Sequence, residues 1–390
     1  MSIVRKSKKI EADIIKYRRD LHEIAECGFE LNETSEYIQN KLSEFNIEYR
    51  IVAKTGIIAT ILCKEGNQTI AIRADMDALP IHEETDLPFK SKNKNSMHAC
   101  GHDAHVAMLL GVARIISENK ELLTNNVRLI FQPAEETTGG AKIMIEEGCL
   151  LDPKVDWIYG LHIGSIFQEV GNGQVGIKYD GMMASVDTFK ANVKGKGGHI
   201  GRPHQGVDPI LTSVEMIIAL QKIVSKEIHP AHPSVISIGK FNSGTTTNII
   251  PETATFEGGV RLINPMDREF TKTRIIEILN NVATANRATV DIEYNAYYPA
   301  VVNETDATNR VKEAAKRVVG EKNLIEILNP SLGSEDMSYY LNEIPGSFFI
   351  LGSSSKNIDG SYYPHHNSKF DIDEKVLWIG TATFLDIIFN

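Results

Sequence analysis

Short runs that are apolar almost throughout constrain the fold of this sequence more than any other feature. They occupy residues 57–62, 69–74, 127–132 and 155–161, and helical stretches are expected at about 103–117 and 139–147. A strand with no polar face requires helices on both sides of its sheet. The pattern therefore predicts an α/β fold for this part of the chain, with a sheet between layers of helices.

The order of the elements changes at about Ser185. The sequence from here on predicts, in order, a strand at 186–193, a helix at 208–226, strands at 234–241 and 253–263, a helix at 267–286 and a strand at 289–297. This β-α-β-β-α-β order is typical of a ferredoxin-like domain. The α/β pattern then returns, with a helix at 306–318, a strand at 348–351 and a helix at 373–389. We expect a first domain of residues 1–183 and 299–390, into which a second domain, 184–298, is inserted; three consecutive small domains are the alternative.

Composition and charge exclude several classes of protein. The 390 residues include 51 acidic and 41 basic side chains, and the formal charge of −10 would repel a nucleic-acid backbone. No apolar stretch approaches the roughly 18 to 20 residues that cross a bilayer. The basic start of the chain, residues 1–20, lacks the apolar core of a secretory signal. We expect a cytoplasmic protein without nucleic-acid or membrane partners.

Polar side chains follow three of the apolar runs at the point where each run ends. Asp75 and Asp77 follow 69–74, Glu135 and Glu136 follow 127–132, and His162 follows 155–161. Ligands of open α/β sheets bind beyond the carboxyl ends of the strands, so we expect these groups to converge. The adjacent carboxylates of Glu135 and Glu136 would repel each other unless a cation lay near them. One could bind a metal ion while the other takes a proton from the metal-bound water.

Residues 97–105, MHACGHDAH, supply a further group of candidate ligands. Cys100 and His102 offer a thiolate and an imidazole two residues apart, and Gly101 between them permits unusual backbone conformations. The zincin motif H-E-x-x-H is absent, and so are the C-x-x-C pairs typical of a structural zinc site. The four cysteines of the chain do not form a disulfide framework.

Eight segments resemble those of the M20 metallopeptidase family: RADMDALP, MHACGHDAH, FQPAEE, GLHI, GKGGH, NIIPE, GSED and HHNSKFDIDE. The resemblance runs from about residue 10 to the end. It is closest to the amidohydrolase branch, which includes aminoacylases, hippurate hydrolases, N-acetyldiaminopimelate deacetylases and auxin-conjugate hydrolases. It implies a zinc-peptidase-like catalytic domain with a mixed sheet between helices, interrupted by a lid domain that also forms a homodimer.

The resemblance implies two divalent metal ions per subunit, and Zn, Mn, Co or Ni would suit the donor types. The implied ligands are Cys100, His102, Glu136, His162 and His366, with Cys100 as the bridge between the ions. On their own, His365 and His366 indicate an ordinary surface loop. The resemblance selects His366, because the family's ligand stands four residues before the phenylalanine that aligns with Phe370.

The resemblance also implies roles in catalysis. Glu135 would be the general base, and Asp77 would orient a metal-binding histidine. His199 and Asn248 would contact the substrate across the dimer. The implied reaction is hydrolysis of the amide bond of N-acyl-L-amino acids with N-acetyl, N-benzoyl or related acyl groups. Residues 163–165 and 367–368 depart from the family, which often has proline there, so the shape of the acyl pocket is expected to differ.

Two other functions compete with this one. A cysteine hydrolase would use Cys100 as nucleophile with His102 or His105 as base, but the paired glutamates would then have no role. A non-catalytic metal-binding or amino-acid-binding protein would keep the fold without the chemistry, although the base and every implied ligand are present. No G-x-G-x-x-G segment follows the first strands, which argues against a dinucleotide-dependent oxidoreductase.

Overall fold

The computed structural model describes residues 3–64, 66, 68–137, 139–354 and 363–390 of the chain. The chain divides into two compact units. The large unit comprises Met1–Asp180, Val302–Asn329 and Asp336–Asn390, and the small unit comprises Gly181–Val301 and Pro330–Glu335. The predicted insertion at 184–298 lies within the small unit, to which the segment 330–335 also belongs.

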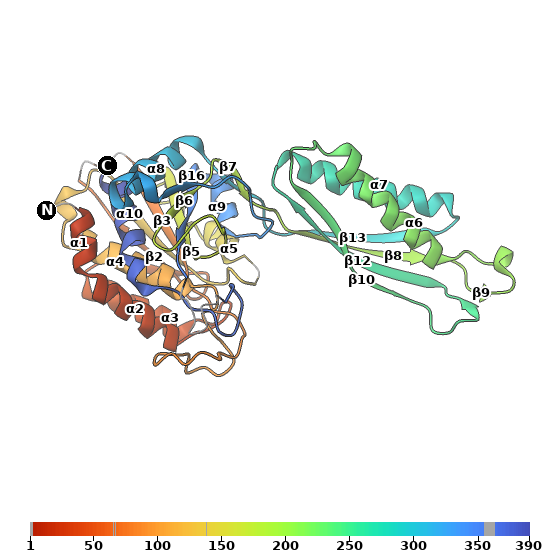
Figure 1. Cartoon of the computed structure of the whole chain (residues 1–390), viewed down its shortest axis with the longest axis horizontal. Helices are drawn as coiled ribbons and strands as arrows, with labels where there is room; N and C mark the ends of the chain where they lie inside the picture. Colours follow the sequence, from red (N-terminus) through yellow and green to blue (C-terminus); the bar gives the residue numbers. More distant parts are fainter. Residues whose placement is uncertain (1–2, 65, 67, 138, 355–362) are drawn as a thin grey trace. The chain divides into compact units, whose positions relative to one another are not determined.

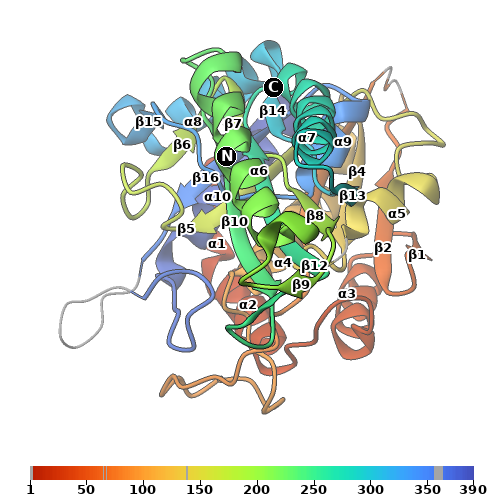
Figure 2. The same ribbon diagram turned by 90° about the vertical axis from the view of Figure 1, so that its right-hand side faces the viewer.

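An eight-stranded mixed sheet forms the centre of the large unit. Its spatial order is β1 (Tyr49–Val52), β2 (Gly56–Ile61), β4 (Asn126–Gln132), β3 (Thr69–Asp75), β5 (Trp157–Gly164), β16 (Gly346–Gly352), β6 (Val175–Ile177) and β15 (Leu324–Glu326). The central strands β4, β3, β5 and β16 are parallel, whereas β2 and β6 run antiparallel to β4 and β16. Figure 2 shows the strands crossing the large unit from β15 and β6 on one side to β2 and β1 on the other. The predicted α/β fold with a mixed sheet is confirmed.

Helices cover both faces of this sheet. They are α1 (Ile3–Lys9), α2 (Glu11–Glu23), α3 (Asn32–Glu44), α4 (His102–Ser117), α5 (Gly140–Glu146), α8 (Thr305–Val319), α9 (Met337–Glu343) and α10 (Leu377–Phe389), with short turns η1 (Lys120–Leu122), η4 (Glu321–Asn323) and η5 (Glu374–Val376). Along β5, Tyr159 and Leu161 join the core that contains α4, whereas a Cβ added at Gly160 would lie 3.3 Å from Met337 Sδ of α9. Successive strand residues point to opposite faces, so α4 and α9 cover opposite sides.

Helix α4 is held tightly in the large unit. Nearly all its side chains are buried, and it packs against β3, α2 and α10. A Cβ added at Gly111 would lie 3.0 Å from atoms of both Ile14 in α2 and Thr381 in α10. This close packing fixes the first turn of α4, where the MHACGHD segment ends. The helix predicted at 103–117 is therefore confirmed.

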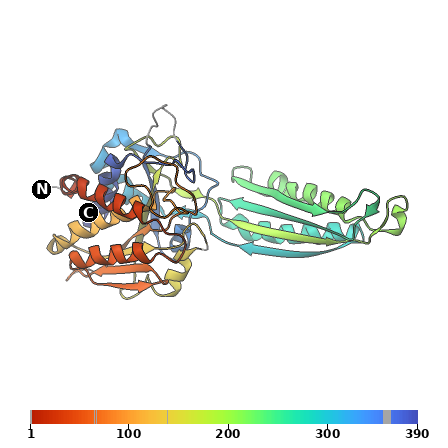
Figure 3. The ribbon, with the colours of Figure 1, turned by 90° about the horizontal axis from the view of Figure 1, so that it is seen from below.

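The small unit has a four-stranded antiparallel sheet, and its helices lie on one face of that sheet (Figures 1 and 3). The strand order is β10 (Ser234–Ser243), β12 (Thr253–Leu262), β8 (Asp187–Lys194) and β13 (Thr289–Ala296), and the helices are α6 (Pro209–Lys222) and α7 (Met266–Ala285). Alternate residues of β8 are buried, and Phe189 and Val193 join Met216 and Leu220 of α6 in a separate core. The predicted β-α-β-β-α-β series is present.

Shorter elements complete the chain. Strand β9 (Gly198–His199) pairs with β11 (Ile249–Ile250), β7 (Asp180–Met183) pairs with β14 (Val301–Asn303), and η2 (Pro203–Gln205) and η3 (Ile223–Glu227) are short helical turns. Among the described residues, every helix is too short or too polar to span a membrane.

Two predicted helices differ from the structure at one end. The helix expected to reach 226 ends as α6 at Lys222, and η3 follows as a π-helical turn. Ser225 Oγ donates to the carbonyl of Gln221 at 2.9 Å, and such side-chain bonding competes with regular helical geometry. The helix expected from 373 begins at Leu377, because the Asp373 carboxylate caps the short turn η5 by accepting the N–H of Lys375.

Candidate metal centre

Side chains from five parts of the chain come together at the carboxyl ends of the parallel strands. Asp75 ends β3, Glu135 and Glu136 follow β4, His162 lies near the end of β5, Cys100 and His102 come from the start of α4, and His365 and His366 from the loop before η5. The structure thus brings together the groups that follow the apolar runs and the histidines of the C-terminal loop.

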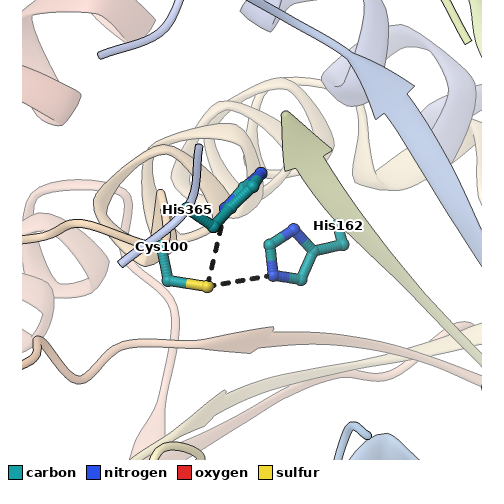
Figure 4. Close-up of side chains that lie close together, drawn as sticks. All are labelled: Cys100, His162 and His365. Atoms are coloured by element: carbon teal, nitrogen blue, oxygen red, sulfur yellow. Dashed lines mark hydrogen bonds between the residues drawn. The ribbon is translucent and has the colours of Figure 1, made fainter. Parts of the chain in front are cut away.

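The Cys100 sulfur belongs to two groups of potential ligand atoms, and the atoms of each group lie within 4.8 Å of one another. One group adds His102 and Glu136, and the other adds His162 and His365. Cys100 Sγ lies 3.3 Å from His162 Nε2, and His102 Nε2 lies 3.9 Å from Glu136 Oε1. Figure 4 shows the cysteine sulfur with dashed lines to both His162 and His365. A sulfur shared by two donor groups is the arrangement that a bridging ligand requires.

The two adjacent histidines of the C-terminal loop approach different atoms. His366 Nε2 lies 3.2 Å from Glu136 Oε1, whereas His365 Nδ1 lies 3.7 Å from Cys100 Sγ. His366 has a left-handed backbone with φ of 66°, and its N–H donates to the carbonyl of Ala99 at 2.9 Å. The loop is therefore tied to the segment that carries Cys100. Both histidines reach the cluster, and the choice of His366 as the ligand stays a prediction.

Asp77 organises the two segments around it. Its carboxylate accepts the backbone N–H groups of Glu135 at 3.0 Å and Glu136 at 3.1 Å. Its own carbonyl accepts Nδ1–H of His102 at 2.9 Å. Burial raises the pKa of Asp77, and the nearby Glu136 carboxylate adds to the rise while His102 opposes it. This position suits the predicted role of orienting a metal-binding histidine.

The ring nitrogens of His102 and His162 are arranged to bind an ion. Nδ1 of His102 faces the Asp77 carbonyl, and Nδ1 of His162 faces the Ile163 carbonyl at 2.7 Å. A carbonyl only accepts, so each neutral ring carries its proton on Nδ1 and a lone pair on Nε2. Among the described residues, the buried atoms His102 Nε2 and Glu136 Oε1 have no well-directed hydrogen bond. These nitrogen and oxygen atoms, together with the nearby Cys100 sulfur, are donor types that bind a divalent metal ion.

A buried network that the sequence reasoning did not find supports the cluster. Arg73 donates to Asp75 at 2.8 Å and to Asp336 at 2.5 Å. Asp75 also accepts Nδ1–H of His105, whose Nε2 accepts the N–H of Ile163 at 2.9 Å. Both nitrogens of His105 are occupied, so this residue fixes the end of β5 and is not available as a base for the cysteine. The sequence indicated Asp75 and His105 as candidate site residues, but gave no sign that Arg73 would join Asp75 to Asp336.

Buried carboxylates leave the cluster with unbalanced negative charge. Burial, and then the Glu136 carboxylate, raises the pKa of the Cys100 thiol well above its ordinary value. Burial opposes protonation of His102, but Asp75 and Asp77 outweigh it and raise the pKa of that imidazole to about 10. A cation would favour the thiolate and the neutral imidazole instead. Without a cation, the raised thiol pKa is the opposite of what a cysteine nucleophile needs, which argues against the cysteine hydrolase.

His199 and Asn248 lie side by side on the small unit. His199 pairs with Ile249 between β9 and β11, and the N–H of Ile200 donates to the Asn248 carbonyl at 3.2 Å. Both side chains are exposed. His199 Nδ1 accepts the N–H of Gly201 at 2.9 Å, so the neutral ring carries its proton on Nε2. The small unit therefore presents an imidazole N–H next to a side-chain amide.

Comparison with known proteins decides the family. The model of peptidase family M20/M25/M40 matches residues 71–390. The chain belongs to this family. Thermostable carboxypeptidase 1 of Saccharolobus solfataricus is 39% identical over 389 residues, which cover 97% of this chain and 96% of the relative. N-acetyl-L-cysteine deacetylase of Bacillus subtilis is 39% identical over 371 residues, which cover 94% of this chain and 85% of the relative.

The M20 resemblance of the sequence motifs is thereby confirmed, and the chain is a metal-dependent hydrolase of amide bonds. A solved structure of a Bacillus subtilis protein, described as a dinuclear metal-binding peptidase of the M20 family, is similar with a TM-score of 0.84 and 34% identity. The similarity covers 98% of each chain. The fold of this M20 chain therefore has a close structural parallel in a protein that is described as binding two metal ions.

A substitution at Gly101 tests whether metal binding at the M20 centre depends on the backbone conformation between Cys100 and His102. Gly101 has φ of 88°, and an added Cβ would lie 2.7 Å from Ile163 Cγ2. We expect Gly101→Ala to shift the Cys100–His102 segment and to weaken metal binding about 10- to 100-fold, as changes in ligand support commonly do. Competition with a chelator measures the affinity. Gly239→Ala is the control, because no atom lies within 4 Å of its added Cβ; equal affinity in the two variants would contradict the prediction.

Proposed function

We propose that this M20 enzyme hydrolyses the amide bond of N-acyl-L-amino acids with two divalent metal ions. The observation that carries the proposal is the Glu136 carboxylate in the donor cluster of the shared sulfur, with Glu135 next to it in the chain. Glu136 contributes a buried carboxylate oxygen to the donor cluster of Cys100 and His102, and His366 Nε2 lies 3.2 Å from this oxygen. Glu135 follows β4 next to it, and its side chain is buried. In this proposal, Glu136 holds an ion while Glu135 accepts and returns a proton.

The proposed mechanism assigns each step to a group of this chain. Metal ions at Cys100, His102, Glu136, His162 and His366 would supply Lewis acidity and lower the pKa of a bound water. As the oxygen of the attacking water bonds to the amide carbonyl carbon, Glu135 accepts a proton from that water. Glu135 then returns that proton to the amide nitrogen as the C–N bond breaks. Asp77 holds the backbone of Glu135 and the ring of His102 in place.

The substrate class is supported by the relatives together with the site. One relative is named a carboxypeptidase and another an N-acetyl-L-cysteine deacetylase, and both names describe cleavage of an amide bond of an amino-acid derivative. The acyl group is open to test, because the departures at 163–165 and 367–368 directly follow His162 and His366 in the sequence. The N–H of Ser165 contacts His365 at 3.1 Å, and Ser368 Oγ donates to Glu84 at 2.7 Å.

The proposal is tested with N-acetyl, N-benzoyl and indole-acetyl amino acids, assayed before and after chelation. Activity should disappear with the chelator and return when Zn, Mn, Co or Ni is added. Activity that is indifferent to chelation would refute the metal mechanism. Stable binding of metal without hydrolysis of any N-acyl amino acid would favour the non-catalytic binding protein instead.

We further propose a homodimer formed through the small unit. Helix α6 exposes a line of apolar side chains: Leu211 is 55% exposed, Val214 42% and Ile218 63%. The spacings of three and four residues place them on one helix face. An apolar face of this kind is typical of a protein–protein interface. In such a dimer, His199 and Asn248 of one subunit would contact the substrate bound to the other.

Mixing two inactive variants tests whether His199 acts across the dimer. We expect Glu135→Gln and His199→Ala to be inactive separately and to regain activity when their subunits are exchanged. In the mixed dimer, the subunit with an intact Glu135 would receive an intact His199 from its partner. Activity is measured after subunit exchange, and each variant incubated alone is the control. If His199 acted within its own subunit, no site in the mixed dimer would be complete and activity would stay absent.

A further inference from the structure

We propose that His365 acts on the metal centre as a hydrogen-bond donor to the Cys100 sulfur and does not bind an ion itself. The inference rests on the proposed function, because it concerns the same centre. It adds a positioning residue whose N–H sets how strongly the shared sulfur donates charge to the ions.

The position of the His365 ring is fixed on several sides. The backbone N–H of Ser165 donates to His365 Nε2 at 3.1 Å. The ring packs on Phe370 with centroids 4.6 Å apart and on His162 with centroids 5.2 Å apart. A Cβ added at Gly164 would lie 2.2 Å from His365 Nε2, so only a glycine there leaves room for the ring. This packing turns the other nitrogen, Nδ1, toward Cys100.

The hydrogen bond from Ser165 decides which ring nitrogen carries the proton. A backbone N–H can only donate, so Nε2 of His365 must offer a lone pair. In the neutral imidazole the proton is then on Nδ1, which lies 3.7 Å from Cys100 Sγ, within the range of a hydrogen bond to sulfur. His365 therefore presents an N–H group where a ligand would have to present a lone pair.

His162 approaches the same sulfur with the opposite polarity. Its Nδ1 donates to the Ile163 carbonyl, so the lone pair on Nε2 points toward Cys100 Sγ at 3.3 Å. Figure 4 shows the two rings on the sulfur from different directions. His162 thus has the geometry of a metal ligand, whereas His365 has that of a hydrogen-bond donor to the sulfur. Hydrogen bonds to a ligating sulfur reduce its electron donation and tune the metal that it binds.

Two amide substitutions separate the donor role from the role of filling space. The side-chain nitrogen of His365→Asn can occupy the place of Nδ1 and donate to the sulfur. The amide of His365→Gln reaches the place of Nε2, where its oxygen can accept the Ser165 N–H without reaching the sulfur. In cobalt-substituted protein, the charge-transfer band from thiolate to Co(II) reports how strongly the sulfur donates. We expect the band to move to longer wavelength in His365→Gln and to stay near the wild-type position in His365→Asn, with cobalt content unchanged in both.

The possible failures are distinguishable. Loss of one cobalt ion from both variants would show that His365 is a ligand and would overturn the inference. Full cobalt content with the same band position in both variants and the wild type would also overturn it, because the N–H would then have no effect on the sulfur. A wild-type protein that binds cobalt without any thiolate band would refute the proposed metal centre itself, and this inference with it.

Discussion

Glu135→Gln is expected to keep its metal ions and to lose about 10²- to 10⁴-fold in kcat, the range that a positioned general base contributes. Glutamine has nearly the size of glutamate but cannot accept the proton of the attacking water. The backbone N–H of Glu135 donates to Asp77, and this contact does not involve the substituted side chain. The loop after β4 should therefore keep its conformation. Measurement of kcat alongside elemental analysis of the bound metal checks both parts of the prediction.

Glu136→Gln is the matched control for this experiment. It makes the same chemical change one residue later, at the carboxylate that lies in the donor cluster with Cys100 and His102. We expect this variant to lose metal content as well as activity. If Glu135→Gln retained near wild-type turnover at full metal content, Glu135 would not be the base. If the two variants lost metal equally, the division of roles between the two glutamates would be wrong.

Arg18→Met is expected to reduce the free energy of unfolding by about 3–5 kcal/mol, the usual cost of removing one partner from a buried ion pair. The Arg18 side chain is 1% exposed. It donates to Asp103 at 2.8 Å, and it lies 3.3 Å from Asp371 and 3.2 Å from Glu374. Methionine would fill much of the space but leave the buried Asp103 without a guanidinium partner. Urea unfolding of the metal-free protein measures the loss without a contribution from bound ions.

The neighbouring Arg19 provides the control. Its side chain is 47% exposed and pairs with the same Glu374. An exposed ion pair contributes about 0–1 kcal/mol, so Arg19→Met should have a small effect. The Arg18 contacts join α2 to the first turn of α4 and to the loop that follows His366. Equal destabilisation by the two substitutions would show that Arg18 does not have this cross-linking role.

Much of the fold and many of the candidate ligands could be predicted from the sequence, because they depend on local pattern. The apolar runs predicted β3, β4 and β5, and parallel strands bring their carboxyl ends to one edge of a sheet. Gly101 between Cys100 and His102 indicated an unusual backbone, and the structure has a left-handed conformation there.

The supporting contacts could not be predicted, because their partners are far apart in the sequence. Arg18 lies on an amphipathic helix, where an arginine is ordinarily exposed, and only the packed structure shows its burial beside Asp103. The contact of Arg73 with Asp336 joins two segments that no periodicity connects. Likewise, the different directions of His365 and His366 depend on the backbone of one loop and on the room left by Gly164.

The position of β16 in the large sheet has a consequence for biosynthesis. This strand lies between β5 and β6, although it is made long after both of them. Until residues 346–352 have been made, β5 and β6 lack the neighbour that joins them, and His365 and His366 are still missing from the growing chain. The small unit is mainly one continuous stretch and can fold earlier, since domains generally fold as units during synthesis. The full set of proposed metal ligands can therefore assemble only after β16 and the loop that follows it have been made.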